Sequence, residues 1–227
     1  SPGTDVLMLA AQWEKEFGII VEQAEDEIAA VNMVLGAWYA GARAMTSTSG
    51  GGFALMEEAI SMSGIGELPL VIHNAMRPGP GTGLPTRTEQ GDLNLAMYAG
   101  HGDFPRVLLA PTSLESGVEL GQKAFNIADK YQVPVIILSD ANYLSQSMNL
   151  GKVNLEENEY HVVESTEDYK RYQYTESGIS PRSVPGYGKG LVKVDSDEHT
   201  EEGLITEDFD VRIKMMDKRS EERRVGK

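Results

Sequence analysis

The sequence predicts an α/β fold: a doubly wound, mostly parallel sheet with helices on both faces. Up to about residue 150, segments with the 3.6-residue periodicity of helices alternate with short apolar runs such as LPLVIH and VPVIIL. This alternation is typical of sheets assembled from consecutive β-α-β units. The apolar runs contain little polar alternation, which indicates strands that are buried on both faces.

The first part of this region is expected to contain three helices and two strands. An amphipathic helix is predicted over residues 5–17, and a strand over 18–23. A long apolar helix over 25–41 begins with acidic residues, which are favourable at a helix N-terminus. A strand over 43–48 then leads through the glycines of SGGG into a helix over 53–64.

The second part adds three more strands and one helix. Buried strands are predicted over 68–75, 105–111 and 133–140, because each of these runs is apolar and short. The helix lies between the last two strands, over 113–131, where Ser113 is a suitable N-cap.

The composition changes at about residue 151. Residues 151–227 are polar, tyrosine-rich and short of periodic apolar positions, and they end in the charged run DKRSEERRVGK. We therefore expect one domain over residues 1–150 and an irregular, acidic arm or linker over 151–227 that lies on another body. The final charged run is expected to be solvated.

The overall composition excludes several classes of function. The 227 residues carry a formal charge of -15, which argues against binding to a nucleic-acid backbone. The absence of cysteine excludes disulfides, thiolate-ligated iron–sulfur clusters and a cysteine nucleophile, so a redox centre would have to be on a partner. The apolar runs are too short to span a membrane, and no signal segment is visible, so we expect a cytoplasmic location.

The loop AMRPGPGTGLPTRTEQGD follows a predicted buried strand. At such a strand end, Arg77 could bind a carboxylate, Thr82 and Thr86 could donate hydroxyl hydrogen bonds, and the prolines would hold the loop in shape. A small anionic ligand fits this arrangement. The alternative is an ordinary surface loop in which Arg77 and Arg87 pair with nearby acidic residues.

Glu27 is the last of three acidic residues that open an otherwise apolar helix. It is therefore the one most easily drawn into a buried environment, where a carboxyl group is suited to proton exchange. The alternative is again ordinary, because acidic residues are common in the first turn of a helix.

Other signals point away from metal or nucleotide sites. GHGD has the wrong residue order for a diphosphate–magnesium motif, and a calcium loop within DSDEHTEEG would need Gly and Glu where the chain has Thr200 and Thr206. His73, on a buried strand, is interpreted as a hydrogen-bonded core histidine, and the role of His101 is open. The glycines of SGGG form neither GxGxxG nor a Walker loop.

Four stretches, taken in order, resemble the α subunit of 2-oxoacid:ferredoxin oxidoreductases, most closely the 2-oxoglutarate type. They are QAEDEIAAVNMVLGAWYAGARAMTSTSGGG, MRPGPGTGLPTRTEQGDL, GHGDFPRVLLAP and AFNIADKYQVPVIILSD. The resemblance implies a thiamine diphosphate-binding fold in which this domain holds the pyrimidine end of the cofactor. It also implies a β subunit that supplies the diphosphate–magnesium site and an iron–sulfur cluster.

The resemblance further implies an activity and roles for single residues. The activity is oxidative decarboxylation of a 2-oxoacid, with coenzyme A accepting the acyl group and ferredoxin the electrons. Glu27 falls on the family's catalytic glutamate, which hydrogen-bonds a ring nitrogen of the pyrimidine. Arg77 and Thr86 match residues of the substrate pocket, whereas Ser49 and Gly50 belong to a loop near cofactor and substrate.

The chain departs from the family pattern at two places. The family carries Ser-Gly-Pro-Gly where this chain has SGGG. The family's Tyr-Pro-x-Thr-Pro substrate motif is expected just before SPGTDVL, and the given sequence does not contain it. We therefore expect a fragment that has no turnover on its own. Two rival hypotheses stay open: a non-catalytic assembly module of the same fold, and a relative acting on pyruvate, branched-chain or aryl 2-oxoacids.

Overall fold

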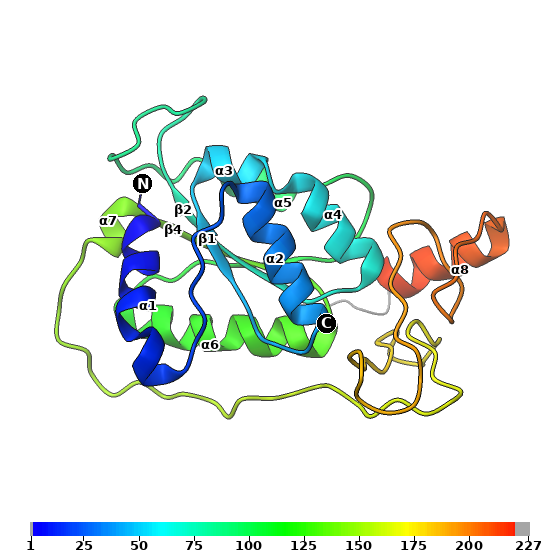
Figure 1. Ribbon diagram of the computed structural model, residues 1–227. Coiled ribbons are helices and arrows are strands. Elements are labelled where there is room, and N and C mark those ends of the chain that lie inside the picture. Colours follow the sequence, from blue (N-terminus) through cyan, green and yellow to red (C-terminus); the bar gives the residue numbers. More distant parts are fainter. Residues whose placement is uncertain (1, 221–227) are drawn as a thin grey trace.

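A computed structural model describes residues 2–220 (Figure 1). Its centre is a parallel sheet of four strands in the order β1-β2-β4-β3. The strands are β1 (Thr46–Thr48), β2 (Leu70–Met76), β3 (Val107–Leu109) and β4 (Pro134–Asp140). Every residue of β2 and β4 is buried, as the apolar runs predict for central strands of a covered sheet.

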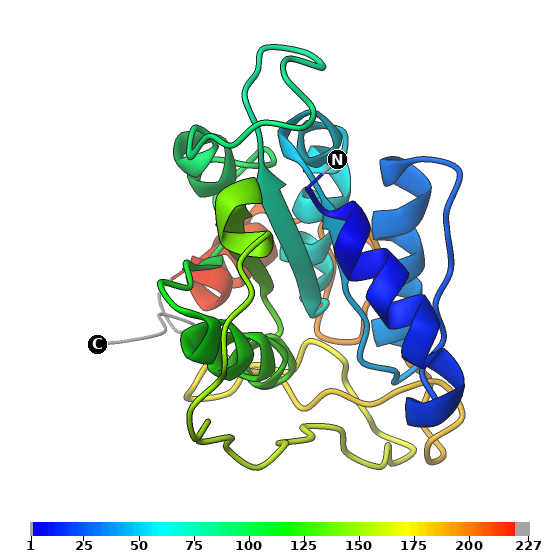
Figure 2. The same ribbon diagram turned by 90° about the vertical axis from the view of Figure 1, so that its left-hand side faces the viewer.

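Helices cover both faces of the sheet, with α2 and α4 on one face and α6 on the other (Figure 2). The eight helices of the described residues are α1 (Thr4–Phe17), α2 (Glu27–Tyr39), α3 (Gly50–Ala54), α4 (Glu57–Gly66), α5 (Leu93–Met97), α6 (Leu114–Tyr131), α7 (Ala141–Leu144) and α8 (Phe209–Ser220). None of these helices is both long and apolar enough to cross a membrane. The predicted doubly wound α/β class is confirmed.

Local capping explains where the two main helices begin. The side chain of Asp26 accepts a hydrogen bond from the backbone N–H of Ala29, 2.8 Å away, so Glu27 becomes the first residue of α2. Ser113 and Ser116 form a reciprocal capping box at the start of α6. The expected Ser113 cap is therefore present.

The strand predicted over residues 18–23 is wrong. Gly18 ends α1 in the left-handed conformation, at φ 63°. The following residues cross outside the sheet without pairing with a strand, and Ile20 is 92% exposed. A short apolar run alone is therefore not sufficient for a strand, because a strand also needs a partner to pair with.

The helix predicted over residues 53–64 is two helices, because α3 already begins at Gly50 and α4 follows after a short turn. The short helices α5 and α7 were not predicted. Both are too brief to show a helical periodicity in the sequence.

Between residues 145 and 208 the chain contains no helix and only isolated bridges, as expected for an irregular arm, but α8 makes the last described part of the arm helical, which was not predicted. The arm passes along the end of the domain opposite the site loop (Figure 1). Buried polar contacts hold it there: Arg182 pairs with Asp129 of α6, and Arg171 donates to the carbonyl oxygen of Glu67 at 2.6 Å. The contacts compensate for the low apolar content of the arm.

The expectation of a solvated charged tail is wrong for its first residues. Lys218 and Arg219 belong to α8 and are each 2% exposed. The ammonium group of Lys218 lies 2.6 Å from the buried carboxylate of Glu67, which removes the cost of an unpaired charge. The rest of the predicted tail lies outside the described residues.

His73 joins three strands. Its Nδ1 lies 2.8 Å from Ser47 Oγ on β1, and its Nε2 lies 2.7 Å from Ser139 Oγ on β4. Both ring nitrogens are therefore satisfied, which confirms the interpretation as a hydrogen-bonded core histidine. Burial lowers the pKa of His73 to about 4.

We expect acidification to weaken the fold through this histidine. The folded state keeps His73 neutral, whereas the unfolded chain takes up a proton below about pH 6.5, so stability falls as the pH drops from about 6.5 to 4. Between pH 7 and pH 5 the expected loss in unfolding free energy is about 2 kcal/mol. Burial also lowers the pKa of His199, which adds to the loss in the same direction.

Urea unfolding of the native chain and of His73→Gln at several pH values measures the effect. The variant should be less stable at pH 7, and its stability should decline less steeply towards pH 5. Identical slopes would show that His73 does not contribute to the pH dependence.

Candidate active site

The candidate residues gather at the edge of the sheet where β1, β2 and β4 end. Ser49 follows β1, Arg77 follows β2, and Asp140 is the last residue of β4. The loop over residues 77–92 rises above this edge, and α2 and α3 both begin there (Figure 1). Ligands of open parallel sheets bind at such edges.

The side chains of the site lie around three consecutive glycines, Gly50–Gly52. A methyl group on Gly50 would lie 2.7 Å from Asp92 Oδ2, and one on Gly52 would lie 2.6 Å from Glu27 Oε1. A methyl group on Gly51 would lie 3.9 Å from Arg77 Nη2. Glu27 and Arg77 therefore both lie close to the first turn of α3, one beside Gly52 and the other near Gly51. Side chains larger than that of glycine would fill the space at this turn.

Glu27 is half-buried at the start of α2. Its carboxyl group packs beside Gly52, and Thr48 of β1 is the other close neighbour of that glycine. The Asp26 cap fixes the backbone on which Glu27 stands. The carboxylate is thus positioned by the helix start rather than by an ion pair among the described residues.

Arg77 is half-buried, and its Nε is a buried donor without a hydrogen-bond partner among residues 2–220. Nearby on β2, the side-chain oxygen of Asn74 is also buried and unpartnered, while its amide donates to Asp92 at 3.1 Å. Unpaired buried polar groups are rare in proteins, so each of them calls for an explanation, and a bound ligand is one. The planar guanidinium of Arg77 is suited to a carboxylate ligand.

The loop itself is largely exposed, including Thr82 and Thr86. The amide of Leu84 donates to the carbonyl oxygen of Pro78 at 3.0 Å, and Gly83 adopts a φ of 56° beneath that turn. A side chain at position 83 would overlap the Pro78 carbonyl, so the turn requires glycine.

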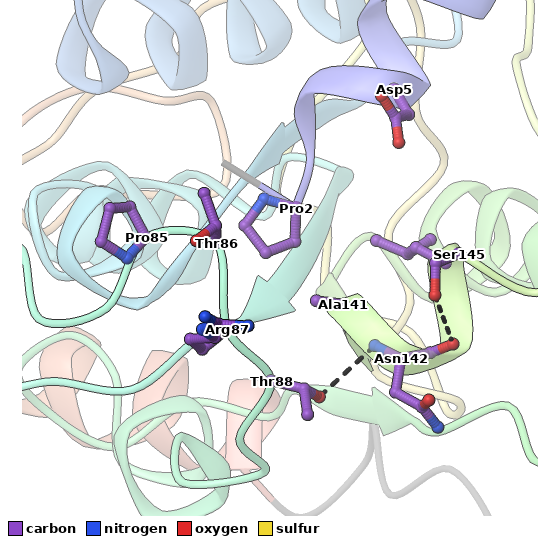
Figure 3. A pocket seen from close by; sticks show the side chains of 10 residues that line it. Pro2, Asp5, Pro85, Thr86, Arg87, Thr88, Ala141, Asn142 and Ser145 are labelled. Carbon is purple, nitrogen blue, oxygen red and sulfur yellow. Dashed lines mark hydrogen bonds between the residues drawn. The ribbon is translucent and has the colours of Figure 1, made fainter.

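A cavity of about 420 Å³ lies between this loop, α7 and the start of α1 (Figure 3). Thr86, Arg87 and Thr88 line it from the loop, whereas Glu27, Ser49, Gly50 and Arg77 do not. The structure therefore separates two sets of predicted residues: Glu27, Ser49, Gly50 and Arg77 meet around α3, and Thr86 borders the cavity. Thr82 lines neither.

Asp140 ties the loop to the sheet, a role that the sequence did not reveal. Its carboxylate accepts hydrogen bonds from Thr88 Oγ1 at 2.9 Å and Gln90 Nε2 at 2.6 Å. Burial alone would raise the pKa of Asp140, but these bonds and the Tyr143 amide outweigh it and lower the pKa. The only sequence signal was an aspartate at the end of an apolar strand.

Within residues 2–220, no group of three or more His, Asp or Glu side chains is arranged to hold a metal ion. His199 is instead buried, with its ring stacked 3.7 Å from that of Tyr172. Arg87, for which pairing with Glu89 or Asp92 was the alternative, forms no ion pair with either in the described part of the chain.

The contact between Gly52 and Glu27 predicts a sensitive position. In Gly52→Ala, the new methyl group would overlap Thr48 Oγ1 and the Glu27 carboxyl, and we expect a loss of about 1–3 kcal/mol in unfolding free energy. Gly36→Ala on α2 is the matched control, because a methyl group there meets nothing within 4 Å. That control should be neutral or slightly stabilising in urea unfolding, since alanine favours helix. Equal effects of the two changes would contradict the packing described for Gly52.

Comparisons with known proteins show the family of the chain. Residues 1–218 match the family described as pyruvate flavodoxin/ferredoxin oxidoreductase, thiamine diphosphate-binding. The chain is 45% identical over 214 residues to the α subunit of 2-oxoacid:ferredoxin oxidoreductase 1 from Sulfurisphaera tokodaii, covering 91% of this chain and 34% of that protein. It is 39% identical over 198 residues to the 2-oxoglutarate synthase subunit KorA of Archaeoglobus fulgidus, covering 84% of this chain and 57% of that protein.

A solved structure is also similar. The 2-oxoglutarate:ferredoxin oxidoreductase of Magnetococcus marinus, with 2-oxoglutarate, coenzyme A and succinyl-CoA bound, superposes with a TM-score of 0.91 at 37% identity. The match covers 98% of this chain and 40% of that one. The chain thus spans about a third to just over half of the length of these relatives. It belongs to the thiamine diphosphate-binding family of pyruvate flavodoxin/ferredoxin oxidoreductases and corresponds to the α-subunit region of a 2-oxoacid:ferredoxin oxidoreductase.

Proposed function

We propose that this chain is the part of an α subunit that activates thiamine diphosphate and binds the substrate in the oxidative decarboxylation of a 2-oxoacid to acyl-CoA and carbon dioxide. Ferredoxin is the electron acceptor. The observation that carries the proposal is the junction at Gly50–Gly52, where a carboxylate and a guanidinium with an unpaired buried donor approach the same turn. One group suits proton exchange and the other suits an anionic substrate.

The residues around α3 fit the pyrimidine end of the cofactor. Glu27 would hold a ring nitrogen, and the small residues of SGGG leave room for a ring at the sheet edge. Thiamine diphosphate, when bound, supplies the nucleophile for the 2-oxo carbon and the electron sink for decarboxylation. Glu27 contributes a proton-exchanging carboxyl group at a fixed position.

Arg77 would bind the carboxylate next to the 2-oxo group. Its Nε needs an acceptor, and a carboxylate can take two parallel N–H bonds from a guanidinium. Thr86, which the resemblance also assigns to the substrate, lies on the same loop but borders the separate cavity. Asp140 holds the loop through Thr88 and Gln90, which reduces the conformational freedom lost on binding.

The substrate proposed is 2-oxoglutarate. Support comes from the 2-oxoglutarate synthase subunit of Archaeoglobus fulgidus and from the Magnetococcus marinus enzyme with bound 2-oxoglutarate. Pyruvate, branched-chain and aryl 2-oxoacids are the competing substrates. We assign the diphosphate–magnesium site and an iron–sulfur cluster to a β subunit, as the resemblance implies, and these 227 residues contain no cysteine that could ligate a cluster.

Reconstitution tests the proposal. The full-length α subunit is expressed with its β partner, and reduction of a viologen dye is followed with 2-oxoglutarate and coenzyme A, with and without added thiamine diphosphate. We expect reduction that depends on all three. If the complex contains the cluster and the cofactor but does not reduce the dye with any of the 2-oxoacids, the assembly-module hypothesis is favoured instead.

A further inference from the structure

The cavity beside Arg87 has features that the proposed roles of Glu27 and Arg77 leave unexplained. It lies where the segments after two adjacent central strands meet, residues 85–88 after β2 and residues 141–145 after β4. Its volume of about 420 Å³ is in the range of small-molecule sites. The carboxyl ends of neighbouring parallel strands are the usual position of such sites.

Arg87 is the single cationic residue among those lining the cavity. Its backbone amide donates to the carbonyl oxygen of Leu84 at 3.1 Å, but its guanidinium forms no ion pair or hydrogen bond with the residues that the structure describes. The hydroxyl of the adjacent Thr86 has no hydrogen-bond partner within residues 2–220 either, whereas the hydroxyls of Thr88 and Ser145 are already hydrogen-bonded. The free donors therefore sit together at the Arg87 end (Figure 3).

The wall under Arg87 is fixed before any ligand arrives. Thr88 Oγ1 donates to Asp140 at 2.9 Å and lies 3.4 Å from the amide nitrogen of Asn142. Asp140 is 5% exposed and also accepts from Gln90. These bonds hold the backbone next to Arg87 in place, which reduces the conformational freedom that the loop would lose when its exposed guanidinium binds an anion.

Resting on the proposed function, we propose that the cavity of Thr86 and Arg87 is a second anion subsite, distinct from the one at Arg77, that binds a carboxylate or phosphate group of a reactant. Two reactants carry such a group: the non-reacting end of a dicarboxylic 2-oxoacid, and coenzyme A. Asp5 also lines the cavity, from α1, and its negative charge confines the anion to the Arg87 end.

Binding measurements on the assembled full-length α–β complex distinguish the two sources. Dissociation constants are measured by calorimetry for 2-oxoglutarate, pyruvate and coenzyme A, in the native complex and in Arg87→Ala. If the anion is the second carboxylate, the constant for 2-oxoglutarate rises about tenfold or more while pyruvate and coenzyme A change less than about twofold. If it is a phosphate, the constant for coenzyme A alone rises.

Two further variants keep the result interpretable. Asp5→Asn removes the opposing charge and should lower the affected dissociation constant, the opposite sign to Arg87→Ala. Lys152→Ala removes an exposed positive charge outside the cavity and should leave all three constants unchanged. Unchanged constants in Arg87→Ala, or equal changes in Arg87→Ala and Lys152→Ala, overturn the subsite. A native complex that binds no 2-oxoacid would instead count against the proposed function.

Discussion

Replacing Glu27 with Gln in the assembled full-length α–β complex is expected to lower kcat for 2-oxoglutarate oxidation by about 10²- to 10⁴-fold. Glutamine has nearly the same shape as glutamate, so the packing against Gly52 and the start of α2 should survive. What is lost is the ability of the side chain to exchange a proton at this position. Complex assembly and the KM for the 2-oxoacid should change little, because the loss falls on the chemical step.

Glu25→Gln is the matched control for this prediction. Glu25 belongs to the same acidic run but is exposed and lies outside the first turn of α2. Steady-state rates and thermal unfolding of both variants are compared with those of the native complex. Near-native rates in Glu27→Gln, or a similar loss in Glu25→Gln, would remove Glu27 from the proton-exchange role.

The sequence predicted those elements whose stability is decided locally. The strands β2 and β4 are continuous apolar runs, and α6 starts at a capping serine, so periodicity and capping rules were sufficient. Arg77 could be placed at a sheet edge because it follows a buried strand, and Glu27 could be placed at the start of a helix. Their proximity to the same glycines needed the three-dimensional structure.

Features that depend on distant residues were missed. Asp140 meets Thr88 and Gln90 about 50 positions away, and Lys218 meets Glu67 across 151 positions. A buried charged side chain at the end of a polar segment looks the same in sequence as a solvated one, since its partner decides its environment. The absent strand at residues 18–23 has a similar cause, because the local sequence does not show whether a run will pair with another strand.

Replacing Arg77 with Ala in the assembled full-length α–β complex is expected to raise the KM for the 2-oxoacid by about tenfold to a hundredfold, while the KM for coenzyme A stays the same. The expectation follows from a charge-assisted bond to a carboxylate in a half-buried position, which is stronger than a neutral hydrogen bond. The change should be similar for 2-oxoglutarate and pyruvate, because both carry the carboxylate next to the reacting carbonyl. This separates Arg77 from Arg87, whose removal should discriminate between those two acids if the second subsite binds a carboxylate.

Arg77→Lys tests whether geometry or charge matters at this site. Lysine keeps the positive charge, but it has no group at the position of the buried Nε and cannot form two parallel bonds. We expect a KM between those of the native and Arg77→Ala complexes, and closer to the alanine variant if the planar fork dominates. A native KM in Arg77→Lys would mean that the charge alone is sufficient. A native KM in Arg77→Ala would show that the substrate carboxylate binds elsewhere, and the unpaired Nε would then need another explanation.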